Sequence, residues 1–159
     1  MPELKTYAPS MQPELERFFE ACFTALGWGY HPEGRHADIP DTANIYMKNG
    51  RMWCLCEGER IIGTSAVRAL APGVAEMKRL YVLPEYQGKG CGRLMFETAL
   101  GYAREQGYRK IRLDTQKDRS ASRHLIESSG FVQIPRYDDN PFAELYYELD
   151  LTQPRGETE

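Results

Sequence analysis

Apolar residues recur along the chain at spacings that predict its helices. From Leu15 to Leu26 they return every three or four positions, which indicates a helix with one buried face, with Ser10 as its N-cap. The same pattern from Gly90 to Gln106 predicts a second long helix. A third is expected over Ser120–Ser129, where Gly130 follows as a helix-ending residue.

Short apolar runs rich in β-branched and aromatic residues predict the strands. They cover residues 4–8, Arg51–Glu57, Arg60–Leu70, Ala75–Val82, Lys110–Thr115, Phe131–Ile134 and Leu145–Leu151. A hairpin turn is expected at Gly58-Glu59 and a short helix near Pro40–Met47. This mixture predicts one α/β (α+β) domain over residues 1–151, followed by a flexible polar tail over residues 152–159.

Composition narrows the classes of partner that this domain could have. A formal net charge of -3 argues against a general nucleic-acid binder, which needs a surplus of basic side chains. No apolar run reaches the roughly 18 residues of a membrane span, and the first ten residues lack a signal-peptide core. We therefore expect a cytoplasmic protein that binds neither nucleic acid nor membrane. Its four cysteines lack metal-binding spacings, so no metal is expected.

A glycine-rich segment separates a predicted strand from a predicted helix. It reads Gln87-Gly88-Lys89-Gly90-Cys91-Gly92-Arg93. Glycines let a ligand approach the main chain, and a helix N-terminus offers unpaired N–H groups and a partial positive charge, so the segment suits a phosphate. Its spacing fits neither a Walker A loop nor the dinucleotide fingerprint. A purely structural turn is the alternative.

The spacing Gln87-x-x-Gly90-x-Gly92, after a strand ending in Leu80-Tyr81-Val82, resembles the acyl-CoA pyrophosphate loop of the GCN5-related N-acetyltransferase (GNAT) superfamily. Further segments resemble those of a bacterial small-molecule subfamily and follow in the same order, so that the resemblance covers about residues 52–151. The resemblance implies the GNAT fold, with a mixed twisted sheet of six to seven strands splayed at the middle and about four helices on both faces. It also implies transfer of an acetyl group from acetyl-CoA, the cosubstrate, to a primary amine, by a monomer or homodimer.

The resemblance implies a set of cofactor contacts. The main chain from Gly88 to Arg93 would hold the CoA pyrophosphate, and Leu80–Val82 would pair with the pantetheine arm. The cofactor-binding residues implied are Leu80, Tyr81, Val82, Gln87, Gly88, Lys89, Gly90, Cys91, Gly92, Arg93, Arg119 and Ser122. Arg119 stands where the family often has an asparagine.

Several side chains are candidates for the general base and the general acid of the reaction. Glu76, eleven residues before Gln87, has the family's spacing for a general base, although it could instead pair with a nearby cation. Asp114 is a weaker candidate, because a carboxylate in a strand usually pairs with an arginine. At the position where the family usually has the tyrosine that serves as general acid, this chain has Ile126. Three explanations are open. Tyr137, His124 or water protonates CoA, or no acid is needed, or the chain binds acyl-CoA without catalysis. We favour the second.

The acceptor site is expected in two irregular segments rich in aromatic and charged residues. Trp28, Tyr30, Arg35, Arg79 and Arg136 are the predicted substrate-binding residues. The arginines could bind a carboxylate, and Asp138 or Asp139 an ammonium group, which favours a small molecule such as an amino acid over a peptide N-terminus. For each residue alone, a solvated surface position is the alternative.

Overall fold

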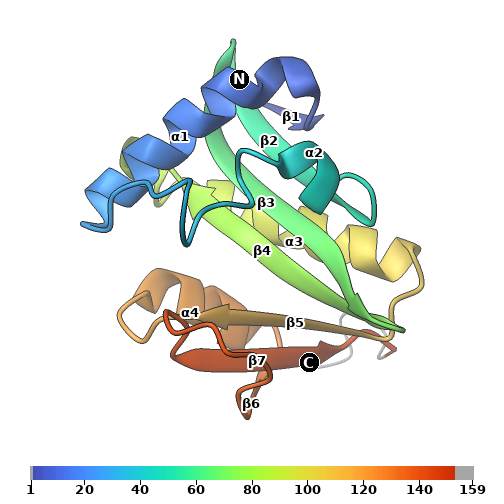
Figure 1. The fold of residues 1–159 in the computed structure, drawn as a ribbon. Helices are drawn as coiled ribbons and strands as arrows, with labels where there is room; N and C mark the ends of the chain where they lie inside the picture. Colours follow the sequence, from blue (N-terminus) through green and yellow to red (C-terminus); the bar gives the residue numbers. More distant parts are fainter. Residues whose placement is uncertain (1, 153–159) are drawn as a thin grey trace. The chain divides into compact units, whose positions relative to one another are not determined.

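The computed structural model describes residues 2–152 of the chain, and within them seven strands form one sheet (Figure 1). Its order is β1-β2-β3-β4-β5-β7-β6. The strands are β1 (Glu3–Thr6), β2 (Gly50–Glu57), β3 (Arg60–Ala71), β4 (Val74–Val82), β5 (Lys110–Thr115), β6 (Val132–Ile134) and β7 (Leu145–Asp150). The helices are α1 (Gln12–Ala25), α2 (Thr42–Ile45), α3 (Cys91–Glu105) and α4 (Ser120–Ser128). The predicted mixed sheet with four helices is confirmed.

The chain forms two compact units. Among the described residues, unit 1 runs to Arg68 and includes Lys78–Ala99, and unit 2 consists of Ala69–Met77 and the residues from Leu100 onward. The prediction of one domain over residues 1–151 stays a prediction. The predicted tail lies outside the described residues from residue 153 onward.

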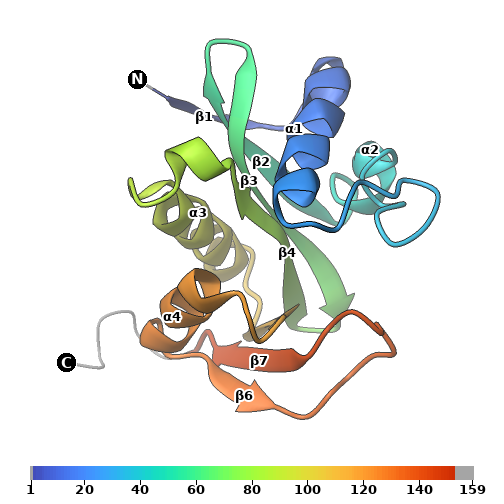
Figure 2. The same ribbon diagram turned by 90° about the vertical axis from the view of Figure 1, so that its left-hand side faces the viewer.

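Unit 1 has its core around strands β2 and β3. Residues Met52–Cys56 and Ile61–Val67 are buried without alternation, which is expected of strands that are covered on both faces. Figures 1 and 2 show helix α1 and the first part of α3 on opposite faces of these strands. The predicted hairpin is confirmed, since Glu57 pairs with Arg60 across Gly58-Glu59.

Unit 2 is organised around strand β5. This strand pairs in parallel with β4 over Val74–Glu76 and in antiparallel fashion with all of β7, which also pairs with β6. Helix α4 belongs to the same unit, and its Glu127 accepts a hydrogen bond from the Tyr147 hydroxyl at 2.6 Å. The side chain of Ile126 is buried, with 3% of its surface exposed. This isoleucine is therefore a core residue of the helix.

The start of α1 differs from the prediction. Ser10 is not its N-cap, because residues Pro9–Met11 form a 3-10 turn and the helix begins only at Gln12. Pro13 lies at the helix start, where its missing N–H group costs nothing and its fixed φ suits the first turn. The short helix predicted near Pro40–Met47 is reduced to the four residues of α2.

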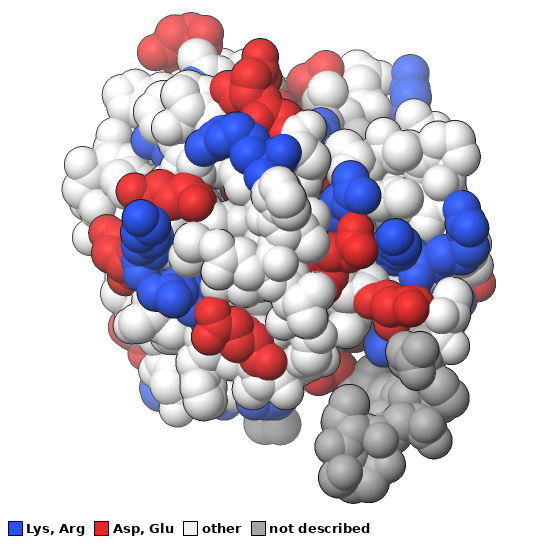
Figure 3. All heavy atoms as spheres, turned by 90° about the horizontal axis from the view of Figure 1, so that it is seen from below, with Lys and Arg blue, Asp and Glu red and all other residues white. Residues whose placement is uncertain are grey.

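Two further observations concern the surface and the membrane. Positive and negative side chains are interspersed on the face in Figure 3, so that face lacks the extended basic patch that phosphate backbones require. Among the described helices, none has the length and apolar character needed to span a bilayer.

Candidate active site

Glu76 and Tyr137 lie in contact within unit 2. Glu76 is fully buried in β4, where it is in register with Arg112 of β5. Its Oε2 atom accepts a hydrogen bond of 2.7 Å from the hydroxyl of Tyr137, which comes from the segment between β6 and β7. The structure thus brings together the two predicted catalytic residues, 61 positions apart in sequence.

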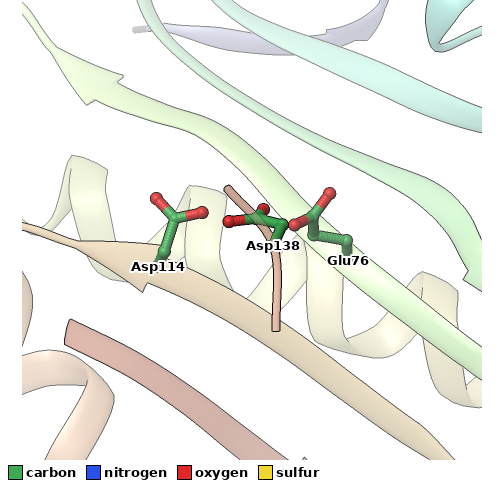
Figure 4. Close-up of side chains that lie close together, drawn as sticks. All are labelled: Glu76, Asp114 and Asp138. Atoms are coloured by element: carbon green, nitrogen blue, oxygen red, sulfur yellow. The ribbon is translucent and has the colours of Figure 1, made fainter. Parts of the chain in front are cut away.

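Two more carboxylates join Glu76. One oxygen each of Glu76, Asp114 and Asp138 lies within 4.8 Å of the others (Figure 4). Asp138 also accepts a 2.6 Å hydrogen bond from the hydroxyl of Tyr146. Three carboxylates this close repel one another and favour a cation between them, either an ammonium group or a metal ion. The group contains Asp114, the weaker of the two predicted candidates for the general base.

The surroundings of Tyr137 keep its hydroxyl protonated. Its ring meets that of Tyr146 edge-on, with centroids 4.9 Å apart, and the Arg112 guanidinium lies 5.3 Å from its centroid. Burial raises the pKa of Tyr137 above its usual range, and the negative charge of Glu76 and the hydrogen bond to it raise it further. At neutral pH this side chain is therefore a hydrogen-bond donor to Glu76.

The glycine-rich segment of unit 1 exposes its main chain at the start of α3. Gly88 and Gly90 have φ angles of 79° and 88°, in the left-handed region that favours glycine. A β-carbon added at either position would meet no atom within 4 Å, so the requirement for glycine is conformational and the main chain stays open. The Nε2 atom of Gln87 donates to the carbonyl of Val82 at 3.0 Å, which ties the segment to the end of β4.

The predicted cofactor residues fall in both units. Those from Leu80 to Arg93 belong to unit 1, and Arg119 and Ser122 belong to unit 2. At the start of α4, Nη2 of Arg119 donates to Oγ of Ser122 at 3.3 Å. The residues of each group are neighbours within their own unit, and the predicted contacts of both groups with CoA stay predictions.

The predicted acceptor residues of the segment after α1 form an aromatic cluster in unit 1. The Trp28 ring stacks on Phe23, and the guanidinium of Arg35 lies 4.8 Å from the centroid of the Trp28 ring. The hydroxyl of Tyr30 donates to Glu16 of α1 at 2.9 Å. The structure brings these three predicted residues together, with each of them packed against another side chain.

Two predicted substrate-binding arginines already bind groups of the protein. Arg79 donates to both carboxylate oxygens of Asp38, from Nε at 2.9 Å and from Nη2 at 2.7 Å. The guanidinium of Arg136 donates to the Tyr146 hydroxyl and to two main-chain carbonyls, all at 2.8 Å. Their role as a clamp for an acceptor carboxylate stays a prediction, and these contacts count against it.

Asp38 is not among the predicted site residues, because it lies in an irregular segment without periodicity. Burial raises the pKa of Asp38, but the hydrogen bonds and positive charge of Arg79 outweigh this effect and lower it from 3.8 to about 2. Tyr46, a fully buried residue, also donates its hydroxyl to this carboxylate. The pair with Arg79 therefore stabilises the folded chain at neutral pH and is lost only as the pH falls through about 2.

His36 makes the stability of unit 1 sensitive to acid. Burial, and then the positive charges of Arg79 and Arg35, lower its pKa from 6.5 to about 4. Between these values the unfolded chain takes up a proton that the folded chain does not, so the free energy of unfolding falls as the pH falls. We expect His36→Phe, which keeps the ring stacked on Phe23, to lose less stability than wild type between pH 6.5 and 4 in urea denaturation.

His124→Gln, a change at an exposed position of α4, is the control and should keep the wild-type pH dependence of stability. An unchanged pH dependence in His36→Phe contradicts the assignment to His36.

Comparison with known proteins places these features in a family context. A family model described as "Acetyltransferase (GNAT) family" matches residues 12–131. The chain is 37% identical over 76 residues to an uncharacterised N-acetyltransferase of Schizosaccharomyces pombe, a match that covers 48% of this chain and 47% of that protein. The chain thus spans about half or less of the length of the first curated relatives it matches.

Solved structures share the fold over almost the whole chain. A GNAT-family acetyltransferase of Staphylococcus aureus Mu50 has a TM-score of 0.86 at 18% identity, covering 95% of this chain and 99% of its own. The PaiA N-acetyltransferase of Thermoplasma acidophilum, solved in complex with coenzyme A, has a TM-score of 0.70 at 17% identity, covering 94% and 99%. At such identities the similarity shows the fold alone.

Proposed function

The chain belongs to the acetyltransferase (GNAT) family, and from this membership we propose that it is an N-acetyltransferase that moves the acetyl group of acetyl-CoA to a primary amine. The observation that carries the proposal is the fully buried carboxylate of Glu76, which is held by Tyr137 and lies beside Asp114 and Asp138. Such a carboxylate can accept a proton from an ammonium group placed among the three acids.

In the proposed reaction, Glu76 removes one proton from the ammonium group, so that the neutral nitrogen can attack the thioester carbonyl. The new C–N bond forms, the C–S bond breaks, and the CoA thiolate leaves. The attacking nitrogen loses its second proton to solvent and becomes the amide nitrogen. A thiolate is a fair leaving group without an acid, because thiols have pKa values near 8.5. Tyr137 orients the Glu76 carboxylate through its hydrogen bond of 2.7 Å and does not need to protonate CoA.

The cofactor end of the proposal rests on unit 1. The open main chain at Gly88 and Gly90, before the 15-residue helix α3, supports a site for the pyrophosphate. The parallel ladder of β4 with β5 consists of the pairs from Val74 to Glu76, and Leu80–Val82 lie beyond it. Their main-chain groups on that edge are the ones that we assign to the pantetheine arm.

The acceptor class that fits the three carboxylates is a positively charged small-molecule amine. An amino acid would also need a guanidinium for its carboxylate. Arg79 and Arg136 use theirs in hydrogen bonds within the protein, and that of Arg35 lies over the Trp28 ring. An amine that lacks a carboxylate is therefore the acceptor we propose to test first. A cytoplasmic location and action as a monomer or homodimer stay predictions.

A non-catalytic acyl-CoA-binding module is the second candidate function, and Ile126 favours it. This buried isoleucine stands at the position where the family usually has the tyrosine that serves as general acid. Release of free thiol from acetyl-CoA, measured against diamines, amino acids and peptides, separates the two functions. Turnover with an amine supports the enzyme, whereas binding of CoA without turnover on the whole panel supports the module. Absence of CoA binding contradicts both.

A further inference from the structure

Arg79 has an unusual backbone conformation for a residue inside a strand. Among the described residues it is the one non-glycine residue with a positive φ, at 55°, and it lies within β4, where an extended backbone is the rule. A side chain with a Cβ adopts this region only where its surroundings compensate for the strain. The contacts of Arg79 should therefore show what holds it there.

Two side chains, the partly buried Asp38 and the buried Thr64, hold Arg79 from opposite ends. At the end of its side chain, Asp38 accepts two hydrogen bonds, at 2.9 and 2.7 Å. At its main chain, the hydroxyl of Thr64 in β3 donates to the Arg79 carbonyl at 2.7 Å. Only 12% of the Arg79 side chain and 18% of the Asp38 side chain are exposed. The residue is thus fixed both by an ion pair and by a hydrogen bond to its backbone.

The strand segment after Arg79 is also fixed at its far end. The main-chain N–H of Leu83 donates to the carbonyl of Ile62 at 3.0 Å, and the carbonyl of Val82 accepts from the Gln87 side chain. Between these anchors lie Leu80, Tyr81 and Val82. Because a left-handed residue redirects the peptide groups that follow it, the conformation of Arg79 sets where the N–H and C=O groups of this segment point.

We propose that Asp38 is a positioning residue: it holds Arg79 in the left-handed conformation and thereby aims the main-chain groups of Leu80–Val82 at the pantetheine arm of acetyl-CoA. This inference rests on the proposed function, which assigns that arm to the same segment. Without the Asp38 carboxylate, a mostly buried guanidinium loses its charge partner, and the left-handed backbone keeps only the hydrogen bond from Thr64. Arg79 then relaxes toward an extended conformation, and the segment turns away from the arm.

The test compares two ligands on the full chain by calorimetry. One is CoA, and the other is its nucleotide part, 3′-phosphoadenosine 5′-diphosphate, which has the pyrophosphate but no pantetheine arm. We expect Asp38→Asn to weaken CoA binding about tenfold, the value of one or two main-chain hydrogen bonds, and to leave the nucleotide affinity unchanged. Equal losses for both ligands, or an unchanged CoA affinity, overturn the proposal.

A second variant keeps the test decisive if Asp38→Asn fails to fold. Glycine adopts a positive φ without support, so Asp38→Asn combined with Arg79→Gly should restore most of the CoA affinity and leaves no buried charge unpaired. A double variant that binds the nucleotide normally but CoA weakly contradicts the proposal.

Tyr46→Phe is the matched control, because it removes the Tyr46 hydroxyl, the other side-chain donor to Asp38, and leaves Arg79 in place. It should lower the melting temperature and leave both affinities unchanged, and a selective loss of CoA affinity in this variant would overturn the role of Arg79. If the wild-type chain binds neither ligand, the proposed function fails before any variant is compared.

Discussion

Glu76→Gln is expected to lower kcat for acetyl transfer at neutral pH by about 100-fold or more, because an amide cannot take the proton of the ammonium group. Glutamine keeps the size of the side chain, and its carbonyl oxygen can still accept the hydrogen bond from Tyr137. The variant should therefore fold and bind CoA as the wild type does. Steady-state kinetics with the best acceptor, together with CoA calorimetry, measure the two effects separately.

The pH profile of Glu76→Gln tests whether the step that the variant lacks is the removal of a proton from the acceptor. As the pH rises toward the pKa of the acceptor itself, solution supplies the neutral amine and the variant should recover most of its rate. Glu105→Gln, at the exposed end of α3, is the matched control and should have wild-type kinetics throughout. An unchanged rate in Glu76→Gln near neutral pH removes the base assignment, and a deficit that persists at high pH indicates a disrupted site.

The local elements of this chain are readable from its sequence, because their signals are local. The apolar pattern predicts Gly90–Gln106 as a helix, and α3 begins and ends within one residue of it. The Gly58-Glu59 turn lies between two strands whose pairing follows directly from it. These features depend on spacings of a few residues, which the sequence displays without any knowledge of the fold.

The candidate site was predictable only where a strand register could be inferred. Asp114 lies two residues beyond Arg112, the partner of Glu76 in the parallel ladder, so both side chains of β5 point to one face. Assuming that β4 and β5 are neighbours would have placed Asp114 near Glu76. Asp38 offered no such signal, because its bond to Arg79 joins residues 41 positions apart, one of them in an irregular segment.

Gly90→Asp is expected to weaken CoA binding about 100-fold while leaving the free energy of unfolding nearly unchanged. The new carboxylate would stand beside the pyrophosphate at the start of α3, so the two negative charges would repel each other. No atom lies within 4 Å of the added Cβ, so the β-carbon itself meets no clash. The positive φ costs about 1 kcal/mol, and a negative charge at a helix N-terminus returns much of that.

Gly107→Asp, at the other end of α3, is the control that separates the effect of a negative charge at the phosphate site from the effect of backbone strain. Gly107 has a φ of 84°, and a β-carbon there also meets no atom within 4 Å, so the strain of the substitution is the same. Here the carboxylate faces the carbonyl end of the helix, where the dipole opposes it. The control should therefore lose more stability than Gly90→Asp and none of its affinity for CoA. The opposite pattern, or equal losses of CoA affinity, would make the glycines of residues 88–92 a structural turn.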